Sequence, residues 1–157
     1  MTSNGGKAAA PYAIRLAREA DTDAIFEVRI AVRENVLTMT QLAELGVTPD
    51  SFREGLRTAP ATWVAEEAGR ILGFGSVEFD DGSVFALFVH PDAEGRGVGG
   101  ALLRVMEAEL FARFPKIWLE TDGASRAAAF YARQGWGVVA ELEEGDVRME
   151  KTGGTPA

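Results

Sequence analysis

The chain has 157 residues, 16 lysines and arginines against 24 aspartates and glutamates, a formal net charge of −8 and no cysteine. This length suits one domain, and the acidic balance argues against a nucleic-acid partner, which would require a basic patch. Without cysteine there is no disulfide, thiolate metal site or acyl-cysteine intermediate, and with one histidine we expect no bound metal.

Neither a membrane span nor a secretory signal is visible. No apolar run approaches the ~20 residues that cross a bilayer, and the N-terminus lacks an apolar signal core. We therefore expect a cytoplasmic protein without a membrane partner. Small and polar residues at 1–10 and 152–157 predict mobile tails on either side of one domain at 11–151.

The first elements are a strand and two helices. Alternation at 12–16 predicts the strand. Helix caps at 21–23 begin a helix with one apolar face, formed by Ile25, Val28, Val32 and Val36. A second helix begins at Thr48-Pro49 and reaches about Arg57.

A hairpin follows, with strands at 63–66 and 71–79 joined around 68–70. The turn Asp80-Asp81-Gly82 leads into a strand that ends at His90. After a glycine-rich turn comes a helix that packs on the sheet through side chains four residues apart, namely Val98, Leu102, Met106 and Leu110.

Pro115 ends that helix. The remaining elements are a strand at 117–121, a helix at 125–134 and a final hairpin of 136–142 with 147–150. This order predicts an α/β fold with a central twisted mixed sheet of about six to seven strands and helices on both faces.

The glycine-rich turn is the most informative segment. Gly95, Gly97 and Gly99 alternate directly before the helix, so the backbone can bring its N–H groups close to a ligand. The first turn of a helix leaves N–H donors unpaired and carries partial positive charge, which favours a phosphate. Arg96 and Arg104 would add formal charge.

Other interpretations of these glycines remain open. The turn could bind nothing, and it lacks the Lys and Ser or Thr that end a P-loop. Gly95, Gly97 and Gly100 satisfy the dinucleotide spacing G-x-G-x-x-G, with Glu120 near the distance of its acidic partner. The turn lies past the middle of the chain, which leaves too little sequence for a full dinucleotide fold.

Two segments together resemble one family. Val89-x-Pro91 followed by 95–103 is similar to the acyl-CoA-binding motif of the GNAT superfamily of N-acetyltransferases. The segment 127–136, with Phe-Tyr before Gly-Trp, resembles that family's later motif. The chain departs from the family at Glu94, where Gln or Arg is usual, and near 123–125, where an Asn is frequent and Ser125 is the nearest polar substitute.

The resemblance implies a GNAT-like fold that uses acetyl-CoA as co-substrate. It implies acetyl transfer to a primary amine of a small molecule or peptide by direct attack in a ternary complex, and it allows a homodimer. The coenzyme-binding residues that it implies are Phe88 and Val89 through their backbone, Gly95, Arg96, Gly97, Val98, Gly99, Gly100, Ala101, Ser125 and Tyr131.

Catalytic and acceptor residues follow from the same resemblance. Tyr131 is the expected proton donor to the departing thiolate. The candidates for the base are Glu34, Glu78 and Glu120. The segment 34–41 is expected to wall the acceptor pocket, with Asn35, Thr38 and Met39 as acceptor contacts and Trp63 as a further apolar wall.

Two other functions compete with this one. A non-catalytic acyl-CoA-binding module on the same fold is suggested by Glu94 and the missing Asn. A nucleotide or dinucleotide binder would use the same glycine turn.

Overall fold

The computed structural model describes residues 11–153, so the tail predicted at 1–10 and residues 154–157 of the tail predicted at 152–157 lie outside the described residues, whereas Thr152 belongs to the last strand. The strands are β1 (Ala13–Leu16), β2 (Thr62–Glu67), β3 (Arg70–Glu78), β4 (Ser83–Val89), β5 (Lys116–Asp122), β6 (Gly137–Glu141) and β7 (Asp146–Thr152). The α-helices are α1 (Thr22–Ala31), α2 (Met39–Glu44), α3 (Pro49–Thr58), α4 (Val98–Phe111) and α5 (Arg126–Arg133).

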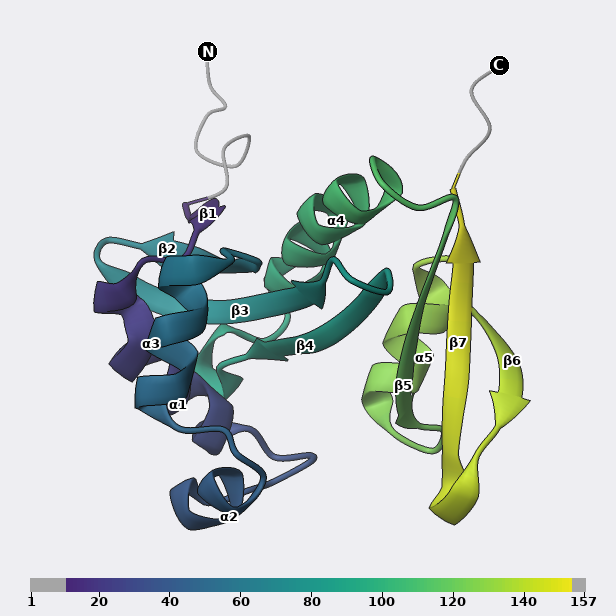
Figure 1. Ribbon diagram of the computed structural model, residues 1–157, viewed down its shortest axis with the longest axis horizontal. Helices are drawn as coiled ribbons and strands as arrows, with labels where there is room; N and C mark the ends of the chain where they lie inside the picture. Colours follow the sequence, from purple (N-terminus) through teal and green to yellow (C-terminus); the bar gives the residue numbers. More distant parts are fainter. Residues whose placement is uncertain (1–10, 154–157) are drawn as a thin grey trace.

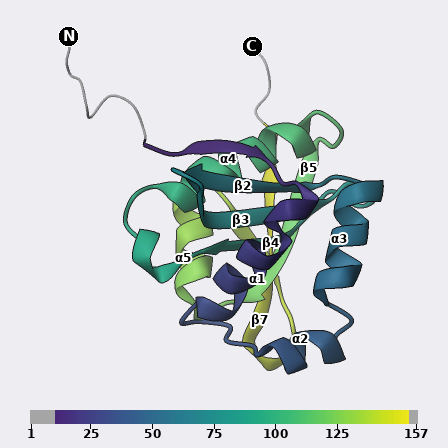
Figure 2. The same cartoon turned by 90° about the vertical axis from the view of Figure 1, so that its left-hand side faces the viewer.

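The strands form one open mixed sheet in the order β1-β2-β3-β4-β5-β7-β6. One core cluster packs α1 and α3 against one face of the sheet, and another packs α4 and α5 against the opposite face (Figures 1 and 2). The predicted fold class is therefore confirmed, including the helices on both faces. Within residues 11–153 no helix is long and apolar enough to cross a bilayer.

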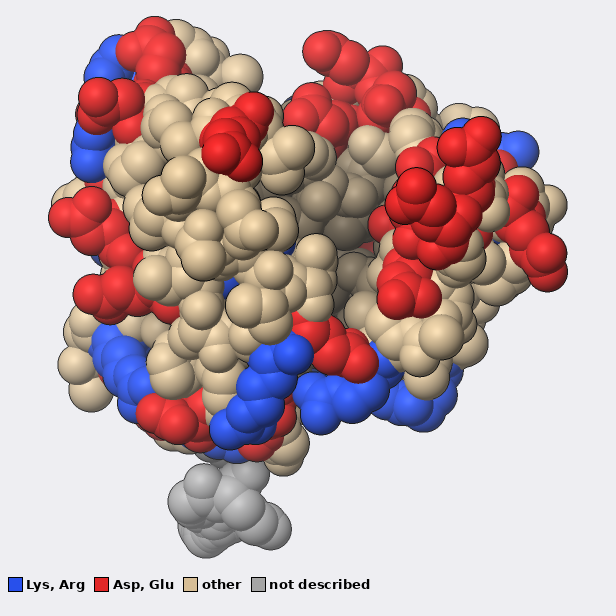
Figure 3. Space-filling view, turned by 90° about the horizontal axis from the view of Figure 1, so that it is seen from below, with Lys and Arg blue, Asp and Glu red and all other residues tan. Residues whose placement is uncertain are grey.

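The sheet is nearly divided between β4 and β5. These neighbours are parallel, and Ser83 with Trp118 is the one residue pair that bridges them in the described chain. Beyond this pair the strands diverge (Figure 1). Seen from below, the surface is hollowed between the half that carries α1–α3 and the half that carries β5–β7 (Figure 3).

Helix α4 holds the two halves together. Its predicted apolar stripe is confirmed, because Val98, Leu102, Met106 and Leu110 are all buried. They share one core cluster with residues from both halves of the sheet. The same helix supplies Glu107, which accepts hydrogen bonds from Trp136 Nε1 at 2.9 Å and Lys151 Nζ at 2.8 Å.

The first helix is shorter than its apolar pattern predicted. It ends at Ala31, because Val32 has an extended backbone with ψ of 155°, and Val36 is 59% exposed. A helix absent from the prediction, α2, begins in the segment expected to be a connection. Thr38 caps it by accepting from the Gln41 N–H at 3.1 Å, while Gln41 Oε1 accepts from the Thr38 N–H at 2.9 Å.

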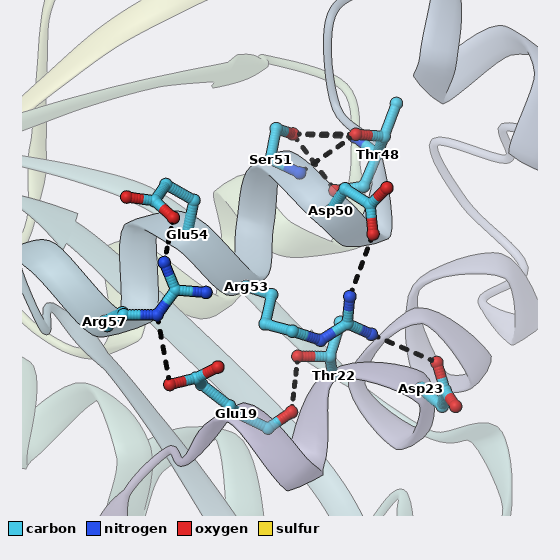
Figure 4. A network of polar contacts seen from close by, with 9 residues as sticks. All are labelled: Glu19, Thr22, Asp23, Thr48, Asp50, Ser51, Arg53, Glu54 and Arg57. Atoms are coloured by element: carbon cyan, nitrogen blue, oxygen red, sulfur yellow. Dashed lines mark hydrogen bonds and ion pairs between the residues drawn. The ribbon is translucent and has the colours of Figure 1, made fainter.

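Charged side chains fix α3 beside α1 (Figure 4). Arg57 pairs with Glu54 on its own helix and with Glu19 before α1, the latter at 3.4 Å. Arg53 reaches Asp23 of α1 at 4.0 Å. Exposed pairs of this kind contribute about 0–1 kcal/mol each, so they orient α3 more than they stabilise the fold.

An ion pair at the turn before α1 is more buried than the pairs between α3 and α1. Arg15 of β1 donates two hydrogen bonds to the Asp21 carboxylate, at 2.8 and 3.0 Å, and the Arg18 N–H donates a third at 2.7 Å. These donors favour the ionised form, so the pKa of Asp21 lies below its ordinary value, with the Arg15 hydrogen bonds as the largest cause.

We expect Asp21→Asn to lower the free energy of unfolding by about 2 kcal/mol at pH 7, the usual scale for hydrogen bonds to a charged group. Because the folded-state pKa is lowered, the contribution of Asp21 is fully present above pH ~4 and is lost as the pH falls through the folded-state value. Urea denaturation from pH 7 to pH 3 measures this difference. Asp23→Asn, in the exposed neighbour, is the control, and a loss for Asp21→Asn that did not shrink in acid would contradict the assignment.

Candidate active site

The glycine turn has the backbone conformation that its sequence predicted. Gly95 and Gly97 both have φ of +80°, in the left-handed region that costs other residues roughly 1–2 kcal/mol. Gly97 is the N-cap of α4 and has no side chain to cap the helix. The turn therefore leads into α4 without a side-chain cap at the start of the helix.

The first amides of α4 have no acceptor within the helix. The Ala101 N–H donates to the Gly97 carbonyl at 3.0 Å, which is the first bond of the helical ladder. The N–H groups of Val98, Gly99 and Gly100 precede it and point out of the helix end. Such an end binds anions through unpaired donors and the helix dipole.

The free edge of β4 offers a second row of main-chain groups. The His90 N–H donates to the Leu72 carbonyl at 2.8 Å, which fixes the ladder between β3 and β4. Since antiparallel partners alternate, the N–H and C=O groups of Leu87 and Val89 point away from β3, to the side from which β5 has diverged. The same alternation directs the N–H and C=O groups of Phe88 toward β3. Of the two residues whose backbone was expected to bind the coenzyme, Phe88 and Val89, only Val89 therefore faces the opening.

The charged residues of the turn are engaged elsewhere. Arg96 makes two hydrogen bonds to the Glu67 carboxylate, at 3.1 and 2.7 Å, so it does not supply the free charge expected of it. Arg104, which belongs to α4 itself, directs its guanidinium back toward the start of that helix. A Cβ added at Gly100 would lie 3.6 Å from its Nη1. Glu94 pairs with Arg33 at 3.4 Å and with Arg126 at 3.2 Å.

The three candidate bases lie in different places. Glu34 follows α1 instead of ending it, and its carboxylate accepts from the Arg126 N–H at 3.1 Å, at the start of α5. Glu78 ends β3 beside Ser83, where β4 and β5 are still joined. Glu120 lies exposed on β5, and since Leu119 belongs to the α4 core, Glu120 faces the side of the sheet that carries α1 and α3.

Tyr131 is a buried phenol, 6% exposed, with its ring edge-on to Phe130 and Trp136. Burial raises its pKa above the ordinary value, so it stays protonated at neutral pH. No hydrogen bond from its hydroxyl to another described residue is present, which leaves a proton donor without a protein partner.

Ser125, which was expected to contact the coenzyme, instead caps α5. Its hydroxyl accepts from the Ala128 N–H at 3.1 Å and donates to the Asp122 carbonyl at 2.6 Å.

A cavity of about 190 Å³ lies on the other side of β4, between the sheet and α1–α3. It is lined by Ile25, Phe26, Arg29, Asn35, Leu37, Leu42, Leu45, Val47, Phe52, Phe74, Ser76, Phe85, Ala86 and Phe88. Of the expected acceptor residues, Asn35 lines it, whereas Thr38 and Met39 do not. Trp63 belongs to the core cluster beneath α4, on the opposite face, so its expected place in the pocket is wrong.

Sequence reasoning missed two lining residues that stand out. Arg29 is four residues after Ile25 on the buried face of α1, and a charge at that position was the available signal. Phe85 occupies a β-bulge, since Ser76 pairs with Ala86 while Val77 pairs with Val84. The bulge leaves Phe85 unpaired and 63% exposed at the cavity, and alternation along the strand could not have indicated it.

Comparison with known proteins points to one family. Residues 58–138 match the family model described as the acetyltransferase (GNAT) domain. The peptidyl-lysine N-acetyltransferase YiaC of Escherichia coli strain K12 is 37% identical over 78 residues, which are 49% of this chain and 50% of that protein. The mycothiol acetyltransferase of Kineococcus radiotolerans is 42% identical over 72 residues, 46% of this chain and 22% of that protein. The chain thus spans half or less of the length of these relatives.

Solved structures share the fold at low sequence identity. The PaiA N-acetyltransferase from Thermoplasma acidophilum, in complex with coenzyme A, superimposes with a TM-score of 0.75 at 14% identity, over 90% of this chain and 99% of that one. The protein yncA from Salmonella typhimurium, with acetyl-CoA, gives a TM-score of 0.72 at 20% identity, over 90% and 94% of the two chains.

We expect Glu94→Gln to strengthen the binding of inorganic pyrophosphate by about two- to fivefold, equivalent to ~0.4–1 kcal/mol. The change removes a negative charge three residues before the N-cap of α4 and releases Arg33 and Arg126 from their pairs. Calorimetric titration at low salt measures it. Glu109→Gln, at an exposed position late in α4, changes the net charge equally and serves as control. Equal affinities for the Glu94 and Glu109 variants would contradict a local effect.

Proposed function

The chain belongs to the GNAT acetyltransferase domain family, and on this premise we propose that it transfers an acetyl group from acetyl-CoA to a primary amine within a ternary complex. The observation that carries the proposal is that two sets of main-chain groups lack a hydrogen-bond partner in the described chain. One set is the N–H groups at the start of α4, and the other is the N–H and C=O groups on the edge of β4. They border the same opening in the sheet, and the second runs directly into the glycine turn that leads to the first.

The residues present fit an acyl-coenzyme A. The amides of Val98, Gly99 and Gly100 suit its diphosphate, and Arg104 adds the nearest positive charge. The outward groups of Leu87 and Val89 suit the amides of an extended pantetheine arm, which would take the place of the missing strand partner. When bound, the coenzyme supplies an acetyl thioester.

The chemistry then needs one bond made and one broken. The amine nitrogen attacks the carbonyl carbon, the carbon–sulfur bond breaks, and the nitrogen loses a proton while the sulfur gains one. A β4 main-chain N–H near Val89 polarises the carbonyl, and one such donor is typically worth ~10²–10³ in rate. Tyr131 donates its proton to the departing thiolate, since its raised pKa keeps the phenol protonated.

We assign the base to Glu120. It faces the side of the sheet that carries the cavity, and it lies on the strand that forms the far wall of the opening. Glu34 is engaged at the start of α5, and Glu78 lies where the opening is closed. Since Glu120 is exposed, a water molecule can carry the proton from the amine to its carboxylate.

An amine and peptide screen with acetyl-CoA, read by thiol release, tests the proposed transfer. We expect at least one amine to release thiol well above the hydrolysis seen without an acceptor. Acetyl-CoA binding without turnover on any amine would instead support a non-catalytic acyl-CoA-binding module, which the acidic Glu94 and the engaged Ser125 favour as the second candidate. Thermal stabilisation by NAD or ATP but not by coenzyme A would indicate a nucleotide binder.

We expect Tyr131→Phe to lower kcat about 10²-fold with little change in the Kd for coenzyme A, because the variant removes the proton donor and keeps the ring. Tyr12→Phe is the comparison. The Tyr12 hydroxyl donates to the Arg96 carbonyl at 3.3 Å, so its loss should affect the glycine turn and the Kd instead of kcat. Unchanged turnover of Tyr131→Phe would remove the phenol from the mechanism.

A further inference from the structure

The cavity between α1–α3 and the sheet contains one formal charge among apolar walls. Its only ionisable lining residue is Arg29, and no aspartate or glutamate of the described chain lines it. The Arg29 side chain comes from the inner face of α1 and is 9% exposed. A cation so placed calls for an explanation, because buried charges are normally paired.

Arg29 is incompletely satisfied by the protein. Its Nη1 donates to the Asn35 carbonyl at 3.1 Å, and its guanidinium lies 4.3 Å from the centre of the Phe88 ring. A guanidinium has five N–H donors, and no other hydrogen bond or ion pair of Arg29 is formed with the described residues. Desolvation alone accordingly lowers its pKa, with no carboxylate to offset it.

The rest of the cavity suits a small apolar group. Apolar cavities of ~150 Å³ take up a molecule the size of benzene, and this one measures about 190 Å³. Its rim is also apolar, with Leu45 69% exposed and Phe85 exposed at the bulge. Large exposed apolar side chains that surround a cavity indicate a binding site.

We propose that the acceptor is a small amine with an apolar body and a carboxylate, of the class of free apolar amino acids, and that Arg29 binds the carboxylate. This inference rests on the proposed function, since it takes the cavity as the acceptor site. The carboxylate supplies the anion that the guanidinium lacks, through charge-assisted hydrogen bonds in a water-poor setting. The apolar side chain fills the space between Phe52, Phe74 and Phe88.

β4 connects this cavity with the coenzyme site. Ala86 and Phe88 line the cavity with their side chains, while the alternate residues Leu87 and Val89 present main-chain groups to the opening. An amino acid held by Arg29 therefore lies against the same strand that would guide the thioester. A lysine side chain of a peptide fits less well, because it brings an ammonium without the carboxylate that would pair with Arg29.

Matched ligands test the carboxylate directly. Calorimetric titrations with L-phenylalanine, L-phenylalaninamide and phenethylamine, each with and without saturating coenzyme A, compare one apolar body with and without the acid. The same three amines are then assayed with acetyl-CoA for thiol release. We expect the acid to bind at least tenfold more tightly than the amide and to give the highest kcat/KM.

Two variants of Arg29 and one control variant show whether Arg29 causes the preference. Arg29→Gln should reduce the preference for acid over amide to within about twofold, and Arg29→Lys should retain part of it. Arg133→Gln, which removes an exposed arginine outside the cavity, should leave the preference intact. Thermal denaturation of each variant checks that it folds, and the wild-type comparison does not depend on any variant.

The outcomes separate this inference from the proposed function. Equal or weaker binding of the acid in the wild type, or a preference that survives Arg29→Gln in a folded protein, would overturn the carboxylate site. Thiol release that favours the amide or phenethylamine would overturn it too, yet would leave acetyl transfer standing. Acid-selective binding that depends on Arg29, without thiol release from any amine, would support the site and contradict acetyl transfer.

Discussion

The parting of β4 from β5 is the constraint on which the rest of the structure depends. A strand inside a sheet normally satisfies its backbone on both sides, but here one bridged pair joins these two strands. The groups on the exposed edge of β4 must then find water or a ligand. Because the strands contribute so little to joining the halves, α4 has to do so, through a buried stripe and the two hydrogen bonds accepted by Glu107.

That single opening brings different chemistries to one strand. The edge of β4 offers hydrogen-bonding groups and ends at the glycine turn, where the amides of α4 begin. One face of β4 forms the wall of an apolar cavity, and the bulge leaves Phe85 exposed at the rim of that cavity. Under the proposed function, coenzyme and acceptor would approach the same few residues from different sides, as direct transfer between them requires.

Much of this was visible in the sequence wherever local rules are strong. The glycine turn, the stripe of α4 and the turn chemistry of the hairpin follow from backbone conformation and periodicity, and all were found where predicted. The first helix was overextended, because Val32 and Val36 continue its apolar spacing although the backbone has already left the helix at Val32. Trp63 was misplaced because a fully buried strand gives no sign of which face each residue takes.

The sequence by itself determined the order of elements except for α2, the conformation of the glycine turn and the family, since these depend on neighbours along the chain. The tertiary structure alone decided that Arg96 pairs with Glu67, that Glu34 meets the start of α5 and that Arg29 lies in an apolar cavity without a carboxylate partner among the described residues. Glu67 and the start of α5 are distant in the sequence from the residues that they meet, and the cavity around Arg29 is formed by the packing of several elements. The sequence names a charged residue without showing whether its side chain is solvated, paired or buried, because only the folded chain fixes the surroundings of that side chain.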